Sequence, residues 1–171
     1  MELSQLCEKF CAKDRFKSLA KAIGNRNNKV LLAEGVAGSS LAMLLSCLPP
    51  RTTPYLIIAN DLDEAGYIYN DLCQIMTDKR VLVFPSGYKR SIKFGQVDAP
   101  QQILRTEVLN RWEKDKELRW VVSYPEALAE KVATREQVSN GTINLAVGEV
   151  LDLTQLQQQL RNLGFVSVDY V

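Results

Sequence analysis

Histidine is absent from this sequence of 171 residues. The imidazole side chain is the usual general base near neutral pH, and it completes the Ser-His-Asp and Cys-His arrangements that activate nucleophiles. Both kinds of catalysis are therefore excluded, which leaves carboxylates as the ready proton carriers. We expect that the chain contains no catalytic residue.

Paired cysteine motifs are also missing, since Cys7, Cys11, Cys47 and Cys73 form no Cys-x-x-Cys pair. Cys7 and Cys11 are one helical turn apart, but two thiols without a histidine make a poor zinc site. We therefore expect no metal site and four buried or unreactive thiols. The chain does not open with a signal-peptide pattern, so we expect a reduced, cytoplasmic protein.

Long apolar runs and an excess of one charge are lacking too. No run approaches the roughly 18 apolar residues of a membrane span, so we expect no membrane partner. The 21 basic and 20 acidic side chains give a net charge of +1. Without a global field, any nucleic-acid binding must depend on a local patch. The 46% of hydrophobic residues is ordinary for a globular protein.

Short apolar runs alternate with segments of helical periodicity over residues 1–133. Apolar positions three and four residues apart predict helices, and short apolar runs between breakers predict buried strands. Helices are predicted at 2–23 with a break near Asp14, at 60–76 with Asn60-Asp61 as its cap, and at 41–48, 101–116 and 125–132. Strands are predicted at 29–33, 55–59, 80–84 and 118–123. The alternation predicts an α/β domain with a parallel, doubly wound sheet.

The pattern changes after about residue 133. Residues 142–147 alternate as a half-exposed strand does, and Asp152 is a suitable cap for a helix at 153–163 that Gly164 closes. Residues 165–171 then predict a second strand. We therefore divide the chain into a domain at 1–133 and the β-α-β start of a small α+β domain at 134–171. Because the last strand lacks a partner, we expect the chain to be part of a longer protein.

A glycine turn lies between the strand predicted at 29–33 and the following helix, which is the context of a phosphate-binding P-loop. That motif reads G-x-x-x-x-G-K-[ST], with backbone amides around the phosphates, a lysine on the β and γ groups and a hydroxyl on magnesium. The segment is a degenerate Walker A sequence, in which a serine, a leucine and an alanine replace the second glycine, the lysine and the hydroxyl residue. Its remnant consists of Gly35, Gly38, Ser39, Ser40, Leu41 and Ala42.

The substitutions remove the chemistry of a P-loop. Leu41 cannot neutralise a triphosphate, and Ala42 offers magnesium no oxygen, so we expect neither nucleotide hydrolysis nor a cofactor in this segment. We interpret the loop as a turn that packs a helix against a sheet. Weak anion binding at the amino end of that helix is the alternative.

The order of several short strings carries a family resemblance along the whole chain. The glycine segment resembles the P-loop of the excision-repair protein UvrB without its lysine and threonine. Five further strings follow it in order along the chain: Asn60–Ala65, Phe84-Pro85, Ser123–Leu128, Leu145–Leu153 and Leu160–Val171. Together with Leu31–Ser40, they resemble the amino-terminal region of bacterial transcription-repair coupling factors (Mfd).

The resemblance implies a UvrB-like module made of domain 1A and the start of an inserted domain 2. Domain 2 is the element of this family that docks UvrA, and the contacting residues are expected beyond residue 171. The full-length protein is expected to be an ATP- and magnesium-dependent translocase on double-stranded DNA that displaces stalled RNA polymerase. The module is expected to support UvrA recruitment in nucleotide excision repair and to restrain the motor.

Two other functions are considered beside this non-catalytic module. A nucleotide-binding, UvrB-type helicase fragment predicts a lysine at position 41 and a serine or threonine at 42, which Leu41 and Ala42 do not provide. Direct nucleic-acid binding would use Lys89, Arg90 and Lys93 in the long loop at 85–100, where Tyr88 and Phe94 flank the basic residues. A solvated loop is the alternative explanation of those charges.

Overall fold

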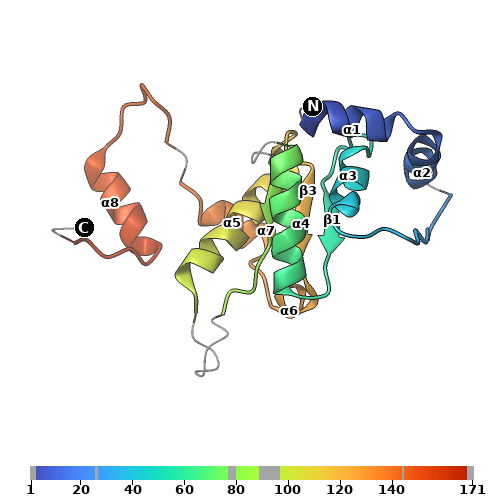
Figure 1. The fold of residues 1–171 in the computed structure, drawn as a ribbon. Coiled ribbons are helices and arrows are strands. Elements are labelled where there is room, and N and C mark those ends of the chain that lie inside the picture. The colour runs from blue at the N-terminus through green and yellow to red at the C-terminus, as the bar shows by residue number, and fades with distance from the viewer. Residues whose placement is uncertain (1–2, 26, 77–79, 89–96, 144, 169–171) are drawn as a thin grey trace. The chain divides into compact units, whose positions relative to one another are not determined.

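The computed structural model describes residues 3–25, 27–76, 80–88, 97–143 and 145–168. The chain forms two compact units, Met1–Lys131 and Val132–Val171. Figure 1 labels the elements of both.

The first unit is built on a sheet of three parallel strands, β1 (Tyr55–Ile58), β2 (Val81–Val83) and β3 (Trp120–Ser123). The strand order is β1-β3-β2, and Trp120 is in register with both Tyr55 and Val81. All four residues of β3 are buried, as is usual for the central strand of a parallel sheet. The predicted α/β class and the strands predicted at 55–59, 80–84 and 118–123 are confirmed.

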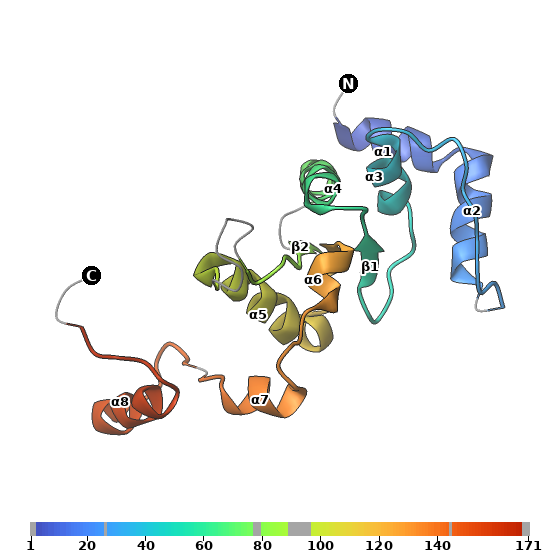
Figure 2. The ribbon, with the colours of Figure 1, turned by 90° about the horizontal axis from the view of Figure 1, so that it is seen from below.

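Helices cover both faces of this sheet (Figure 2). The helix α4 (Leu62–Ile75) packs on β2 and β3, and its amino end is capped by Asp61, as predicted. The helix α5 (Ala99–Lys114) packs on β2 from the other side, and the short α6 (Pro125–Ala129) follows β3. The core is formed mainly by aliphatic residues around the buried indole of β3, including Ala65, Ile68, Leu72, Val81, Val108, Trp120, Val121 and Val122.

The strand predicted at residues 29–33 is wrong, because this segment is neither strand nor helix. Val30 and Leu32 are 87% and 83% exposed. A strand needs a neighbour that bonds to its backbone N–H and C=O groups, and within the described part of the chain no strand lies beside this run. The sheet therefore has three strands where four were predicted, and a doubly wound P-loop sheet is not confirmed.

Two helices precede the glycine loop and one follows it. The helices α1 (Leu3–Cys11) and α2 (Asp14–Gly24) confirm the predicted helical segment and its break near Asp14. The helix α3 (Ser40–Ser46) follows the loop and packs on α1 and α4. None of the residues of α2 is buried, so α1 and α3 make the main contacts of this end of the chain with the core.

The expectation of four thiols is wrong for Cys11 and Cys47, which form a disulfide with their Cα atoms 5.4 Å apart. The packing of α1 on α3 brings together two cysteines that are 36 positions apart in sequence. A proximity of this kind leaves no spacing motif in the sequence. Cys7 is buried and Cys73 is half-buried, and neither is part of a disulfide.

The second unit contains two helices, α7 (Arg135–Asn140) and α8 (Leu153–Asn162). Asp152 caps α8 as predicted, and Gly164, with φ of 90°, follows its carboxyl end. The helix α7 was not predicted, although Thr134 and Gln137 form a capping box at its start. The strands predicted at 142–147 and 165–171 are wrong for the residues that the structure describes, since neither segment has a strand to pair with.

Candidate functional site

The glycine loop turns the chain from the exposed run at 29–33 into α3. Gly35 and Gly38 have φ of 77° and 54°, a left-handed conformation that other residues rarely adopt. The loop-to-helix part of the predicted P-loop context is therefore present, while the strand that should precede it is not.

Three amides of the segment 37–41 donate hydrogen bonds to acceptors within it. The Ala37 N–H donates to the Ser40 hydroxyl oxygen at 3.0 Å, and that hydroxyl donates to the Ala37 carbonyl at 2.5 Å. The N–H groups of Ser40 and Leu41 donate to Ala37 and Gly38 carbonyls, both at 3.3 Å. In a working P-loop such amides surround the phosphates. Here Ser40 supplies the acceptor instead, so the loop closes on itself.

The next two positions belong to the hydrophobic core. Leu41 is half-buried and packs against the core cluster, and Ala42 is 1% exposed. A P-loop places its lysine and its magnesium-binding hydroxyl at these positions. The side chains present can anchor α3 to the core, and they provide neither a cation nor an oxygen ligand. This geometry favours the interpretation of the segment as a packing turn.

A second candidate site, at the long loop, can be described only at its base. Lys89, Arg90 and Lys93, the predicted nucleic-acid contacts, lie outside the described residues. At the base, Tyr88 and Val97 form an antiparallel bridge, and the Asp98 N–H donates to the Gly87 carbonyl at 2.9 Å. The two ends of the loop are therefore held side by side.

Glu130 holds the first of these ends. One of its carboxylate oxygens accepts a hydrogen bond from the Ser86 hydroxyl, and the other accepts the Gly87 N–H at 2.9 Å. The same oxygen lies 3.2 Å from a guanidinium nitrogen of Arg105, which is 4% exposed. A side chain on Gly87 would also collide with Gln102, whose Nε2 would lie 2.2 Å from the added Cβ.

Arg105 extends this network to neighbouring backbone. Its Nη1 donates to the carbonyls of Pro85 at 2.7 Å and Ala127 at 3.1 Å, and its guanidinium lies 4.2 Å from the centroid of the Phe84 ring. This ion pair between the buried Arg105 and the half-buried Glu130 was not predicted from the sequence. A signal was present, because Arg105 lies three residues before the apolar Val108 on the buried side of its helix, where an unpaired charge would be costly.

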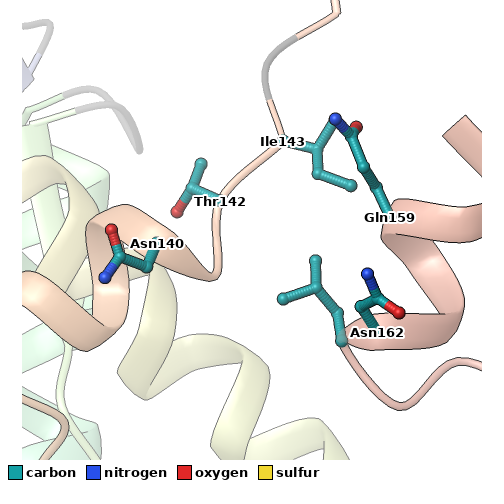
Figure 3. A pocket seen from close by; sticks show the side chains of 6 residues that line it. Asn140, Thr142, Ile143, Gln159 and Asn162 are labelled. Carbon is teal, nitrogen blue, oxygen red and sulfur yellow. The ribbon is translucent and has the colours of Figure 1, made fainter. Parts of the chain in front are cut away.

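The second unit contains an open pocket of about 460 Å³ between α7 and α8 (Figure 3). Amide, hydroxyl and aliphatic side chains line it, from Asn140, Thr142, Ile143, Gln159, Asn162 and Leu163. None of them ionises near neutral pH, so the pocket offers no general acid or base. Within the described residues there is no cluster of His, Cys, Asp or Glu suited to a metal ion, and none of their helices is long and apolar enough to cross a membrane.

Comparison with known proteins relates the chain to one group. Over 159 residues it is 26% identical to the transcription-repair-coupling factor of Bacillus subtilis (strain 168). The resemblance to transcription-repair coupling factors is confirmed. The match covers 92% of this chain, but the chain spans only 13% of the length of that relative. No family model and no solved structure matches the chain. The similarity supports a link to transcription-repair coupling and thereby to DNA repair.

Proposed function

We propose that this chain is the non-catalytic, UvrB-like module of a transcription-repair coupling factor. The main support for this proposal is the similarity to the Bacillus subtilis coupling factor along 92% of the chain. The glycine loop supports the non-catalytic part, because Leu41 and Ala42 pack in the core and Ser40 bonds to the loop's own backbone. Catalysis then belongs to other parts of a longer protein.

In that longer protein, the module supports recruitment of UvrA and restrains the motor. The UvrA contacts are assigned to the domain that begins in the second unit, with the main contacts beyond residue 171. The motor binds ATP and magnesium, translocates on double-stranded DNA and displaces stalled RNA polymerase. The protein acts in the bacterial cytoplasm, in nucleotide excision repair.

A calorimetric titration with magnesium-ATP tests the non-catalytic assignment. The natural chain is compared with a Ser40→Gly, Leu41→Lys, Ala42→Thr variant that restores the P-loop residues. We expect no binding heat from the natural chain, because no cation opposes the phosphate charge. Saturable binding by the natural chain would contradict the proposal and favour a nucleotide-binding, UvrB-type fragment. Circular dichroism of both proteins shows whether the variant is folded, since it places a lysine beside the core.

UvrA recruitment needs a separate measurement on the full-length protein. Binding of purified UvrA to an immobilised coupling factor is measured by biolayer interferometry, with and without the domain that begins at about residue 132. We expect the deletion to abolish UvrA binding and to leave DNA-stimulated ATP hydrolysis intact. Undiminished UvrA binding by the deletion protein would show that another domain recruits UvrA.

A further inference from the structure

Arginines gather at the amino edge of the three-stranded sheet. Arg80 immediately precedes β2 and Arg119 immediately precedes β3, and the Arg119 N–H donates to the Arg80 carbonyl at 2.9 Å. Tyr55, the first residue of β1, donates its N–H to the Arg119 carbonyl at 2.7 Å. The guanidinium of Arg51 lies 4.8 Å from the centroid of the Tyr55 ring. We call Arg51, Arg80 and Arg119 the arginine edge.

The charges of the arginine edge are not neutralised within the described structure. Within the part of the chain that the structure describes, no ion pair involves these three arginines. Arg80 and Arg119 each precede one of two adjacent parallel strands, and their backbones are hydrogen-bonded to each other. Partial burial lowers the pKa of the Arg119 guanidinium, the positive charge of Arg80 lowers it further, and Tyr55 opposes this shift. An anion bound near both arginines would offset the repulsion between them.

The guanidinium of Arg119 is held in place by its surroundings. Its Nη2 donates to the Leu48 carbonyl at 2.6 Å, and its guanidinium lies 4.4 Å from the centroid of the Trp120 ring. Its Nε is buried and has no acceptor within the described part of the chain. These contacts hold the planar group in place beside Arg80. A guanidinium group can bind a carboxylate or phosphate through two parallel hydrogen bonds, which lysine cannot imitate.

The size of the edge favours carboxylates over nucleic acid. The electrostatic affinity for nucleic acid grows with the number of phosphates that a protein neutralises, and this edge offers three cations. Base stacking is not provided for either, because the Tyr55 ring already faces Arg51 and its hydroxyl donates to the Pro49 carbonyl at 2.9 Å. We propose that the arginine edge is a docking site for an acidic peptide segment of a protein partner, with one carboxylate bound between Arg80 and Arg119.

Fluorescence anisotropy with two anionic probes tests the proposal. A fluorescein-labelled oligoglutamate peptide and a labelled oligothymidylate of equal length are titrated with the intact chain at low salt. We expect the peptide to bind and its affinity to fall with added salt. Arg80→Gln should weaken peptide binding about fivefold, as loss of one exposed ion pair can do, and the Arg80→Gln, Arg119→Gln double variant should weaken it further.

A matched control removes two positive charges elsewhere. Lys17 and Lys21 are exposed on α2, and Lys17→Gln with Lys21→Gln lowers the net charge as much as the arginine double variant does. We expect this control to retain most of the peptide affinity. Equal losses in the two double variants would indicate only general charge attraction and would overturn the proposal. Absence of peptide binding, or tighter binding of the oligothymidylate, would overturn it as well.

The stability of Arg80→Gln separates binding from a structural role. The Arg80 side chain is exposed and the substitution removes a like charge next to Arg119, so we expect the Tm to rise slightly while peptide affinity falls. A fall in both the Tm and the affinity would show that Arg80 supports the fold rather than a partner. Arg119→Lys completes the test. This variant retains the positive charge but lacks the planar guanidinium group, so we expect it to bind the peptide more weakly.

Discussion

Glu130 is the residue on which the contacts at the base of the long loop converge. It accepts hydrogen bonds from Ser86 and Gly87 and pairs with the buried Arg105. Removing one partner of a buried ion pair leaves the other charge uncompensated. We therefore expect Glu130→Ala to lower the free energy of unfolding by about 3 kcal/mol, as found when such pairs are broken. Urea denaturation followed by tryptophan fluorescence measures this loss.

Two further variants show whether the ion pair causes that loss. Glu126→Ala removes an exposed glutamate from the same helical segment and should change the free energy of unfolding by less than about 0.5 kcal/mol. In a chain that carries Arg105→Met, Glu130→Ala should cost much less, because no buried charge is left unpaired. An equal cost of Glu130→Ala in both backgrounds would be inconsistent with a role through Arg105.

The sequence predicted these residue roles only where a motif or a local pattern carries them. Ser40, Leu41 and Ala42 could be identified because a P-loop has a fixed spacing. Asp61 and Asp152 could be identified because caps are local in sequence. Glu130 lies 25 positions from Arg105 and beyond the next strand. No short pattern reports such a pair, although an arginine on the buried side of a helix indicates that a partner exists.

At the scale of elements, local periodicity was sufficient for helices and for strands that find a partner. The strands at 55–58, 81–83 and 120–123 were predicted because each is apolar and each pairs within the unit. The runs at 29–33 and 142–147 have similar composition but no neighbouring strand in the described structure. Strand formation depends on such a neighbour and is not decided by the segment alone. The short α7 was missed because six residues contain too little periodicity.

At the same scale, we predict that the disulfide between α1 and α3 stabilises the folded chain. Cys11 and Cys47 enclose α2 and the glycine loop in a covalent loop. Closing a loop of this length restricts the unfolded chain. In the chain-entropy model, this restriction adds about 3–4 kcal/mol to the free energy of unfolding. We expect dithiothreitol, or Cys47→Ser, to lower the free energy of unfolding by that amount. Peptide mapping by mass spectrometry without reductant should recover the two cysteines in one linked pair of peptides.

A chain with Cys7→Ala and Cys73→Ala is the matched control for this experiment. It retains both members of the disulfide, so its free energy of unfolding should still fall when dithiothreitol is added. If four free thiols are counted in the oxidised natural chain, the link is not formed and the prediction fails. In a reducing cytoplasm, the proposed location, both cysteines would be thiols and α1 would be held on α3 by packing alone.

At the scale of the whole molecule, the two units differ in how much they bury. The first contains the hydrophobic core, whereas no residue of α7 or α8 is buried. Several apolar residues of the second unit are largely exposed, among them Val147, Val150, Phe165 and Val166. A unit of this size with so little buried surface has little to offset its loss of conformational entropy. We therefore infer that the second unit opens more easily than the first.

Amide hydrogen exchange, followed by mass spectrometry on the intact chain, measures this difference. The helix α4 is the internal comparison for α8, because both are regular helices capped by an aspartate and only α4 has buried residues. Amides of α8 should exchange at least tenfold faster than those of α4, since α8 can open without disrupting a core. Equal protection of the two helices would show that α8 is covered by apolar contacts in solution, and that the second unit is stable without further chain.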